Sequence, residues 1–216
     1  MSEVTIIDYG LSNLLSVQRA FEHFGATVKF AKTPEEVRSA RALVLPGVGA
    51  FRDGMEGLQK LGLIEPIRER AGAGVPLLGI CLGMQMLFEE SEEFGHWEGL
   101  GLIPGRVVKI PDHDTEGNPQ RVPQVGWNAL LPAGTESDFD GSLLEGVRPG
   151  EEVYFVHSYE AKPTHKEDLL AQTIYGGRRI CAAARRGNVT GCQFHPEKSG
   201  RVGLCVIREF ARAAEL

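Results

Sequence analysis

Residues 76–88 read PLLGICLGMQMLF, an apolar strand that runs directly into a helix with Cys81 at the junction. Gly79 and Gly83 flank the cysteine at −2 and +2, the spacing of a G-x-S-x-G nucleophile elbow with cysteine as the nucleophile. Such a turn needs small neighbours, because strand and helix crowd together, and it lifts the nucleophile over the carboxyl edge of a parallel sheet. The helix N-terminus favours a thiolate there and offers free N–H groups to an oxyanion. The pentapeptide alone is equally typical of a core cysteine packed between two glycines.

A nucleophilic cysteine needs a base, and the base needs a group that orients it. Among the six histidines, His195 stands out because it lies in GCQFHPE at 191–197, where a short strand ends and Pro196 forces an extended turn. Side chains at i and i+2 of an extended segment point the same way, so Glu197 can approach the imidazole ring and fix its tautomer. A lone histidine is more often structural, but the two framed motifs together favour a Cys81–His195–Glu197 triad.

Around these motifs, apolar runs alternate with amphipathic ones through the first half of the chain. This alternation predicts a parallel sheet with helices on both faces. A capping box, with Thr33 at the N-cap, Pro34 at N1 and Glu36 at N3, marks one helix start. The predicted strands span 4–7, 27–30, 42–45 and 75–80, and the predicted helices span 12–24, 55–70 and 82–90.

The second half contains apolar runs with few helices between them, which predicts mixed or antiparallel strands added to the same sheet. A stretch rich in Pro, Gly and Asp at 111–150 is expected to form long loops, and amphipathic spacing at 199–214 predicts a closing helix. We see no internal repeat and no linker between two cores. The sequence therefore predicts a single α/β domain over 1–216, with a central mostly parallel or mixed sheet flanked by helices. The added strands are expected at 106–110, 152–156, 170–175, 180–184 and 188–193.

The composition narrows the classes of function. With 23 Lys and Arg against 29 Asp and Glu, the formal charge of −6 disfavours a strongly basic nucleic-acid binder. The N-terminus lacks the features of a signal peptide, and no segment approaches the roughly 18 apolar residues of a membrane span. The four cysteines form no C-x-x-C pair, so zinc-type spacing is missing. We therefore expect a reduced, cytoplasmic protein with no metal and no other cofactor.

The segments GICLGMQ at 79–85 and FHPE at 194–197 together resemble the class I (triad) glutamine amidotransferases, and the match in order and distance covers nearly the whole chain. The resemblance implies a flavodoxin-like α/β fold and a glutaminase that makes ammonia from glutamine through a Cys–His–Glu triad. Other segments are similar to the glutaminase subunit of imidazole glycerol phosphate synthase, an enzyme of histidine biosynthesis. These segments are DYGLSNL at 8–14, with Ser12 in place of the usual glycine, PGVG at 46–49, QVGWN at 124–128, YFVHSY at 154–159, and Lys198.

The resemblance also assigns roles to individual residues. The N–H groups of Leu82 and Val48 are the expected oxyanion donors, and Gly49 gives its loop the freedom to turn a peptide. Gln85, one helical turn after the cysteine, is expected to contact the amino-acid moiety of glutamine. The other expected contacts are Gly47 and the main chain of His157, Ser158 and Tyr159 for the substrate, and Asn13, Tyr154 and Lys198 for the partner subunit.

The sequence shows no P-loop and no room for a second active site, so the acceptor of the ammonia must lie on another chain. In the resembled family this partner is a (β/α)₈ cyclase, which forms a heterodimer with the glutaminase. It makes imidazole glycerol phosphate and aminoimidazole carboxamide ribotide. Such glutaminases are nearly idle until the partner binds its ligand, which suits an oxyanion loop that must rearrange. Nucleic acids and membranes are not expected partners.

Three alternatives stay open on the sequence alone. A stand-alone cysteine peptidase or γ-glutamyl hydrolase would use the same elbow without a partner. A binding module would keep the fold without catalysis, although the intact triad argues against it. A glutaminase for anthranilate or pyridoxal phosphate synthesis would carry a P-G-P-G or P-G-G-E loop at 46–49. The acidic stretch 89–93 receives no role from the sequence.

Overall fold

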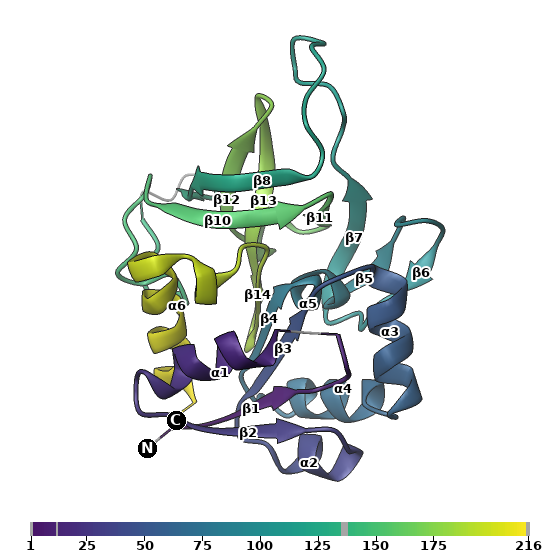
Figure 1. Ribbon diagram of the computed structural model, residues 1–216, viewed down its shortest axis with the longest axis vertical. Helices are drawn as coiled ribbons and strands as arrows, with labels where there is room; N and C mark the ends of the chain where they lie inside the picture. Colours follow the sequence, from purple (N-terminus) through teal and green to yellow (C-terminus); the bar gives the residue numbers. More distant parts are fainter. Residues whose placement is uncertain (1, 12, 135–137, 215–216) are drawn as a thin grey trace.

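The computed structural model describes residues 2–11, 13–134 and 138–214, and its centre is an eight-stranded sheet (Figure 1). Its strands lie in the order β2-β1-β3-β4-β14-β13-β12-β9, with the first five parallel and the last three antiparallel to their neighbours. The predicted α/β fold with a mixed central sheet is therefore confirmed. The bounds are β1 (Glu3–Ile7), β2 (Thr27–Ala31), β3 (Leu43–Gly47), β4 (Leu77–Cys81), β9 (Leu131–Pro132), β12 (Leu169–Tyr175), β13 (Arg178–Arg186) and β14 (Val189–Cys192).

Helices cover both faces of the inner parallel strands, which explains why β3 and β4 are buried throughout, whereas most of the edge strand β2 is exposed. Successive residues of β1 point to opposite faces. Ile6 belongs to the core with α1 (Leu14–Glu22) and α6 (Gly200–Ala213), and Ile7 belongs to the core of the other face. Figure 1 shows α1 and α6 together, away from α3 and α4. The helices of the second face are α2 (Pro34–Ser39), α3 (Phe51–Lys60), α4 (Ile64–Gly72) and α5 (Leu82–Met86).

Two predicted helices are shorter than their amphipathic patterns indicated. The segment 55–70 is split between α3 and α4, because Gly62 follows the first helix with a φ of +66°, a conformation that ends helices. The helix predicted at 82–90 stops at Met86, because the chain enters strand β5 (Phe88–Ser91) and pairs with another strand there. Sheet pairing has thus overridden the helical pattern after Met86.

The capping box at the start of α2 forms as predicted. The Thr33 hydroxyl accepts a hydrogen bond from the Glu36 N–H, and the Glu36 carboxylate accepts one from the Thr33 N–H. Helix α1 begins at Leu14, and its predicted start at Ser12 lies outside the described residues. Among the described residues, no helix is long and apolar enough to cross a membrane.

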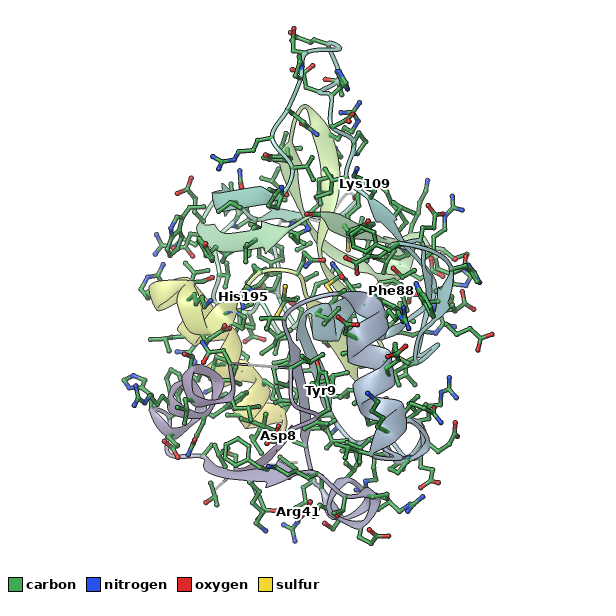
Figure 2. The ribbon with its side chains drawn as sticks, turned by 45° about the vertical axis from the view of Figure 1, so that its right-hand side comes forward. Asp8, Tyr9, Arg41, Phe88, Lys109 and His195 are labelled. Carbon is green, nitrogen blue, oxygen red and sulfur yellow. The ribbon has the colours of Figure 1, made fainter. Side chains whose placement is uncertain are left out.

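Two smaller sheets accompany the central one. The first has the order β11-β7-β5-β6, and the second pairs β8 with β10. The segment 111–150, predicted as long loops, therefore contains β8 and β9 as well. The connection from β7 to β8 projects from the top of the molecule in Figure 1, and Lys109 lies at its base in Figure 2. The bounds are β6 (Trp97–Glu98), β7 (Ile103–Lys109), β8 (Gln124–Ala129), β10 (Glu152–His157), β11 (Tyr159–Pro163) and the 3-10 turn η1 (Lys166–Asp168).

The central sheet brings three distant segments to one edge. Strand β4 lies between β3 and β14, with Gly47 opposite Cys81 and Cys192 opposite Ile80. Because the three strands are parallel, the segments that follow Gly47, Cys81 and Cys192 emerge at the same carboxyl edge. This edge is where open α/β sheets bind ligands.

Candidate active site

Cys81 occupies a strained turn between β4 and α5. Its φ of +54° and ψ of −109° lie outside the regions that residues with a side chain normally adopt. A Cβ on Gly83 would lie 1.7 Å from the Leu45 carbonyl oxygen, and a Cβ on Gly79 would lie 2.8 Å from the Gly83 carbonyl carbon. Only glycines allow α5 to approach β3 and β4 so closely. The backbone here has the geometry of a nucleophile elbow.

His195, labelled in Figure 2, lies on the loop from β14 to α6. It lines the same cavity as Cys81. The residue is 3% exposed, and its ring Nδ1 lies 2.8 Å from Glu197 Oε1. Because a carboxylate only accepts, Nδ1 carries the proton of this bond, which leaves Nε2 for the thiol side. Glu197 reaches the ring through the 3-10 turn η2 (Pro196–Lys198), and not through the extended segment that the sequence indicated.

The charge of the His195 ring depends on two opposing effects. Burial disfavours the imidazolium cation, but interactions with Cys81 and Glu197 outweigh it and raise the pKa of His195 to about 9. The imidazole is therefore cationic at neutral pH. A cation at this position favours the thiolate form of a neighbouring cysteine.

A cavity of about 390 Å³ opens beside Cys81. Most residues to which the sequence assigned a role line it, including both predicted oxyanion donors. It is therefore the natural place for a small substrate. Its lining residues are Val48, Gly49, Cys81, Leu82, Gln85, Glu93, Pro123, Val156, His157, Ser158, Tyr159 and His195.

The two predicted oxyanion donors differ in availability. Leu82 is the first residue of α5, where an N–H has no partner within the helix. The N–H of Val48 instead donates to the Leu11 carbonyl oxygen at 3.1 Å. Gly49 follows with a φ of +103°, and both loop residues are exposed. Val48 can serve an oxyanion only after it gives up its bond to Leu11.

Gln85 has an internal role that the sequence did not predict. Its Nε2 donates to the Tyr159 carbonyl oxygen at 3.0 Å and to Gln193 Oε1 at 3.0 Å, so both amide hydrogens are used within the protein. Gln193 is fully buried, and its Nε2 lies 3.7 Å from the Cys81 sulfur. Sequence analysis missed Gln193, although its place two residues before His195 could have signalled it.

Residues 157–159 line the cavity, whereas Gly47, for which the sequence also predicted a substrate contact, ends β3 and is not among the lining residues. His157 Nδ1 lies 2.8 Å from the Tyr159 carbonyl oxygen, so it donates to that oxygen. Burial lowers the pKa of His157 to about 4 despite this bond, so the ring is neutral at neutral pH. His157 lines the cavity, and the main-chain contact with substrate that the sequence predicts for it stays a prediction.

Glu93 is a second residue that sequence analysis did not single out. It lines the cavity, and its Oε2 accepts a hydrogen bond from the Phe51 N–H at 2.6 Å. This bond caps α3, whose own N-cap residue Ala50 supplies no side-chain bond. Burial raises the pKa of the Glu93 carboxyl above its ordinary value.

The three residues expected to face a partner lie on neighbouring elements. Asn13 precedes α1, Tyr154 lies on β10 and Lys198 ends η2, which contacts both of these elements. Asn13 and Lys198 are exposed, and Tyr154 is half-buried. The elements that carry these residues or follow them therefore lie side by side, next to the loop that carries His195.

The described part of the chain contains no group of three His, Cys, Asp or Glu side chains that could hold a metal ion. Each of the four cysteines is a free thiol.

Comparisons with known proteins identify the family. Residues 5–212 match the family described as glutamine amidotransferase class-I. The chain is 52% identical over 210 residues to imidazole glycerol phosphate synthase subunit HisH 1 of Legionella pneumophila strain Lens, covering 97% of this chain and 99% of that protein. It is 48% identical over 208 residues to subunit HisH of Syntrophotalea carbinolica, covering 96% and 98%.

Two solved structures share the fold at low sequence identity. A structure described as a glutamine amidotransferase superimposes with a TM-score of 0.73 at 20% identity, over 99% of both chains. A chain of PurLQS from Thermotoga maritima gives a TM-score of 0.71 at 19% identity, over 99% of both chains.

Proposed function

The chain belongs to the class-I glutamine amidotransferases, within the group of imidazole glycerol phosphate synthase HisH subunits, and from this membership we propose that it hydrolyses glutamine to glutamate and ammonia for a cyclase partner. The partner would use the ammonia to form imidazole glycerol phosphate and aminoimidazole carboxamide ribotide in histidine biosynthesis. The observation that carries the proposal is Cys81 in its strained elbow beside the His195–Glu197 pair, at one cavity. The free thiols favour a reducing, cytoplasmic setting.

The chemistry follows from the positions of these side chains. The Cys81 thiolate attacks the side-chain amide carbon of glutamine. The Leu82 N–H donates a hydrogen bond to the carbonyl oxygen as negative charge develops on it. His195 gives its Nε2 proton to the leaving ammonia. The neutral ring then takes a proton from water, which hydrolyses the γ-glutamyl thioester and frees Cys81. Glu197 holds the ring in one tautomer and stabilises its cation through both steps.

The oxyanion loop supports the dependence on a partner. In the resting arrangement the Val48 N–H is bound to Leu11, so one of the two expected donors is occupied. One oxyanion donor contributes roughly 3–4 kcal/mol to the transition state. Release of Val48 by a bound partner would therefore raise glutamine hydrolysis by a large factor without any change in the triad.

The β8–β10 ribbon offers a surface for the partner. Its outer face carries two cross-strand pairs, Trp127 opposite Tyr154 and Val125 opposite Val156. Trp127 is 51% exposed and Val125 is 49% exposed, which is unusual for large apolar side chains that stand side by side. The Val156 carbonyl oxygen lies 4.0 Å from the Cys81 sulfur, so a partner bound on this ribbon would be close to the nucleophile.

The test mixes the purified chain with the cyclase subunit and the cyclase ligand and measures the release of glutamate. We expect strong stimulation by the liganded cyclase. A chain that hydrolysed glutamine equally well alone would contradict the assignment and favour a stand-alone hydrolase. Cys81→Ser is expected to abolish glutamine hydrolysis while the complex still forms. Synthesis from added ammonia is expected to persist in that complex, because it needs only the cyclase.

A further inference from the structure

Two buried glutamines form a continuous chain of hydrogen bonds that ends on the Cys81 sulfur. The chain begins at the Tyr159 main-chain carbonyl, passes through Gln85 and Gln193, and reaches the thiol. Gln193 is fully buried and Gln85 is 6% exposed. Buried amides are held at such places only where their polar atoms find partners.

The orientation of both amides is fixed by the Tyr159 carbonyl, with which this series of hydrogen bonds begins. A main-chain carbonyl can only accept, so Gln85 must present its NH₂ group to Tyr159. The second hydrogen of that NH₂ group faces Gln193 Oε1, so Gln193 presents its oxygen to Gln85. The NH₂ group of Gln193, and not its oxygen, therefore faces Cys81, with 3.7 Å between Nε2 and the sulfur.

We propose that Gln193 is a thiolate-stabilising catalytic residue, which donates an N–H···S hydrogen bond to Cys81 in an orientation enforced by Gln85. The proposal rests on the proposed function only in taking Cys81 as the nucleophile. A thiolate is a better acceptor than a thiol, so the donor favours the ionised sulfur. The Gln193 amide adds no charge of its own, and its N–H stays in place when His195 gives up its proton during the reaction.

The backbone of Gln193 makes the donor rigid. Its N–H donates to the Ala182 carbonyl oxygen at 2.9 Å, across from the neighbouring strand β13. The side chain is fully buried and its Oε1 is bound to Gln85, so it has little freedom to follow the sulfur if the sulfur moves. A rigid donor orients the nucleophile as well as stabilising its charge.

Other ionisable groups interact with this sulfur or line the cavity beside it, and a test must leave them unchanged. The Gln193→Met substitution does so, because it replaces a neutral amide by a neutral thioether of similar length. These groups are Tyr9 after β1, Cys192 at the end of β14, His157 at the end of β10, His195 with Glu197 behind it, and Glu93 across the cavity.

The experiment measures the rate of Cys81 alkylation by iodoacetamide against pH in the full chain, with mass spectrometry to identify the modified cysteine. In Gln193→Met we expect the midpoint of the profile to move up by about one pH unit, and alkylation at neutral pH to slow about tenfold. Gln85→Met is expected to give a smaller shift in the same direction, because Gln193 then loses the partner that orients it.

Gln172→Met is the matched control, because Gln172 is a buried glutamine whose Nε2 donates to the Pro132 carbonyl oxygen, in another part of the sheet. Its alkylation profile is expected to match the wild type. Thermal unfolding of all variants shows whether the fold is intact. Coincident profiles for wild type and a folded Gln193→Met variant would overturn the proposal.

The same assay separates this proposal from the proposed function. A wild-type Cys81 that is unreactive toward iodoacetamide at neutral pH would contradict its role as the nucleophile. A reactive wild-type Cys81 with an unshifted Gln193→Met profile would contradict only the role of Gln193. If Gln193→Met does not fold, Gln193→Leu and the Gln85→Met profile carry the test.

Discussion

The two sides of the active-site cavity are held very differently. On the nucleophile side, which comprises Cys81, Gln193, His195 and Glu197, each side chain is buried or nearly so and has a hydrogen-bond partner. On the oxyanion side, the loop 47–50 is exposed at Val48 and Gly49, and Val48 donates to a carbonyl outside the cavity. The nucleophile is thus prepared for reaction while one expected oxyanion donor is not.

The ends of the oxyanion loop are nevertheless fixed. The Tyr9 hydroxyl donates to the Pro46 carbonyl oxygen at 2.8 Å, and the Phe51 N–H donates to Glu93 at 2.6 Å. Any rearrangement is therefore confined to the peptides between Pro46 and Phe51. A bound partner would therefore need to move only a few peptides to complete the site. Four substitutions test whether the two sides are independent.

The largest effect is expected from Gly83→Ala on the nucleophile side. The new Cβ would lie 1.7 Å from the Leu45 carbonyl oxygen, so α5 must move away from β3 and carry the elbow with it. We expect no measurable glutaminase activity and a free energy of unfolding lowered by about 3 kcal/mol. Urea unfolding and glutamate release measure the two effects. Gly72→Ala is the control, because its Cβ would meet nothing within 4 Å; loss of activity there would undermine the steric explanation.

Glu197→Gln is expected to reduce kcat about a thousandfold or more, because the neutral amide no longer stabilises the His195 cation.

The same substitution also tests a pH dependence of the free energy of unfolding. The folded pKa of His195, about 9, lies above the ordinary value of 6.5, so the folded state binds the proton more tightly. The resulting stabilisation is fully present below pH 6.5 and is lost as the pH rises through 9.

Urea unfolding at pH 6 and pH 10 measures this loss. We expect the decrease between the two pH values to be smaller in Glu197→Gln than in the wild type. Glu167→Gln, which changes an exposed carboxylate, is expected to behave like the wild type. An equal decrease in wild type and Glu197→Gln would show that the ion pair does not raise the proton affinity of His195.

Gly49→Ala tests the oxyanion side alone. Its φ of +103° is strained for any residue with a Cβ, while the Cβ itself would meet nothing within 4 Å. We expect the partner-stimulated kcat to fall about tenfold to a hundredfold, with KM and the alkylation of Cys81 unchanged. Gly187→Ala, at a φ of +58° in open space, is the control for a distant glycine. A change in Cys81 alkylation in Gly49→Ala would mean that the two sides are coupled.

The sequence predicted the nucleophile side better than the oxyanion side, for a physical reason. The elbow depends on local crowding, so the glycines at 79 and 83 and the apolar strand before them carry its signal. The parallel half of the sheet was predictable because strands buried on both faces are apolar runs between amphipathic helices. The pairing of Phe88–Ser91 with Ile103–Lys109 was not, because partners of added strands are set by contacts distant in sequence.

The missed site residues share this dependence on distant contacts. Gln193 matters because β14 lies next to β4, which places its amide beside the thiol. Glu93 lies in an acidic stretch that looks like a solvated surface, and only the return of the chain through β5 places it at the cavity. The hydrogen bond that engages the Val48 N–H likewise depends on Leu11, which is 37 positions away in the sequence.

The smallest expected effect is that of Glu93→Gln, at the junction between the two sides. Among the described residues, Glu93 is the one carboxylate that lines the cavity apart from the triad, so it is the natural partner for the α-ammonium group of glutamine. The amide oxygen of glutamine at position 93 can still accept from the Phe51 N–H and keep α3 capped. We therefore expect KM for glutamine to rise about tenfold, with the partner-stimulated kcat changed less than twofold.

This outcome separates charge from loop anchoring. Glu93→Ala removes both the charge and the cap of α3, so it is expected to lower kcat as well as to raise KM, because one end of the oxyanion loop is released. Glu92→Gln is the matched control, since Glu92 is exposed and pairs with Arg106 outside the cavity. Equal kcat values for Glu93→Gln and Glu93→Ala would show that the Phe51 bond does not hold the loop. In that case the oxyanion loop would not be anchored at Phe51, and the movable half of the site would include α3.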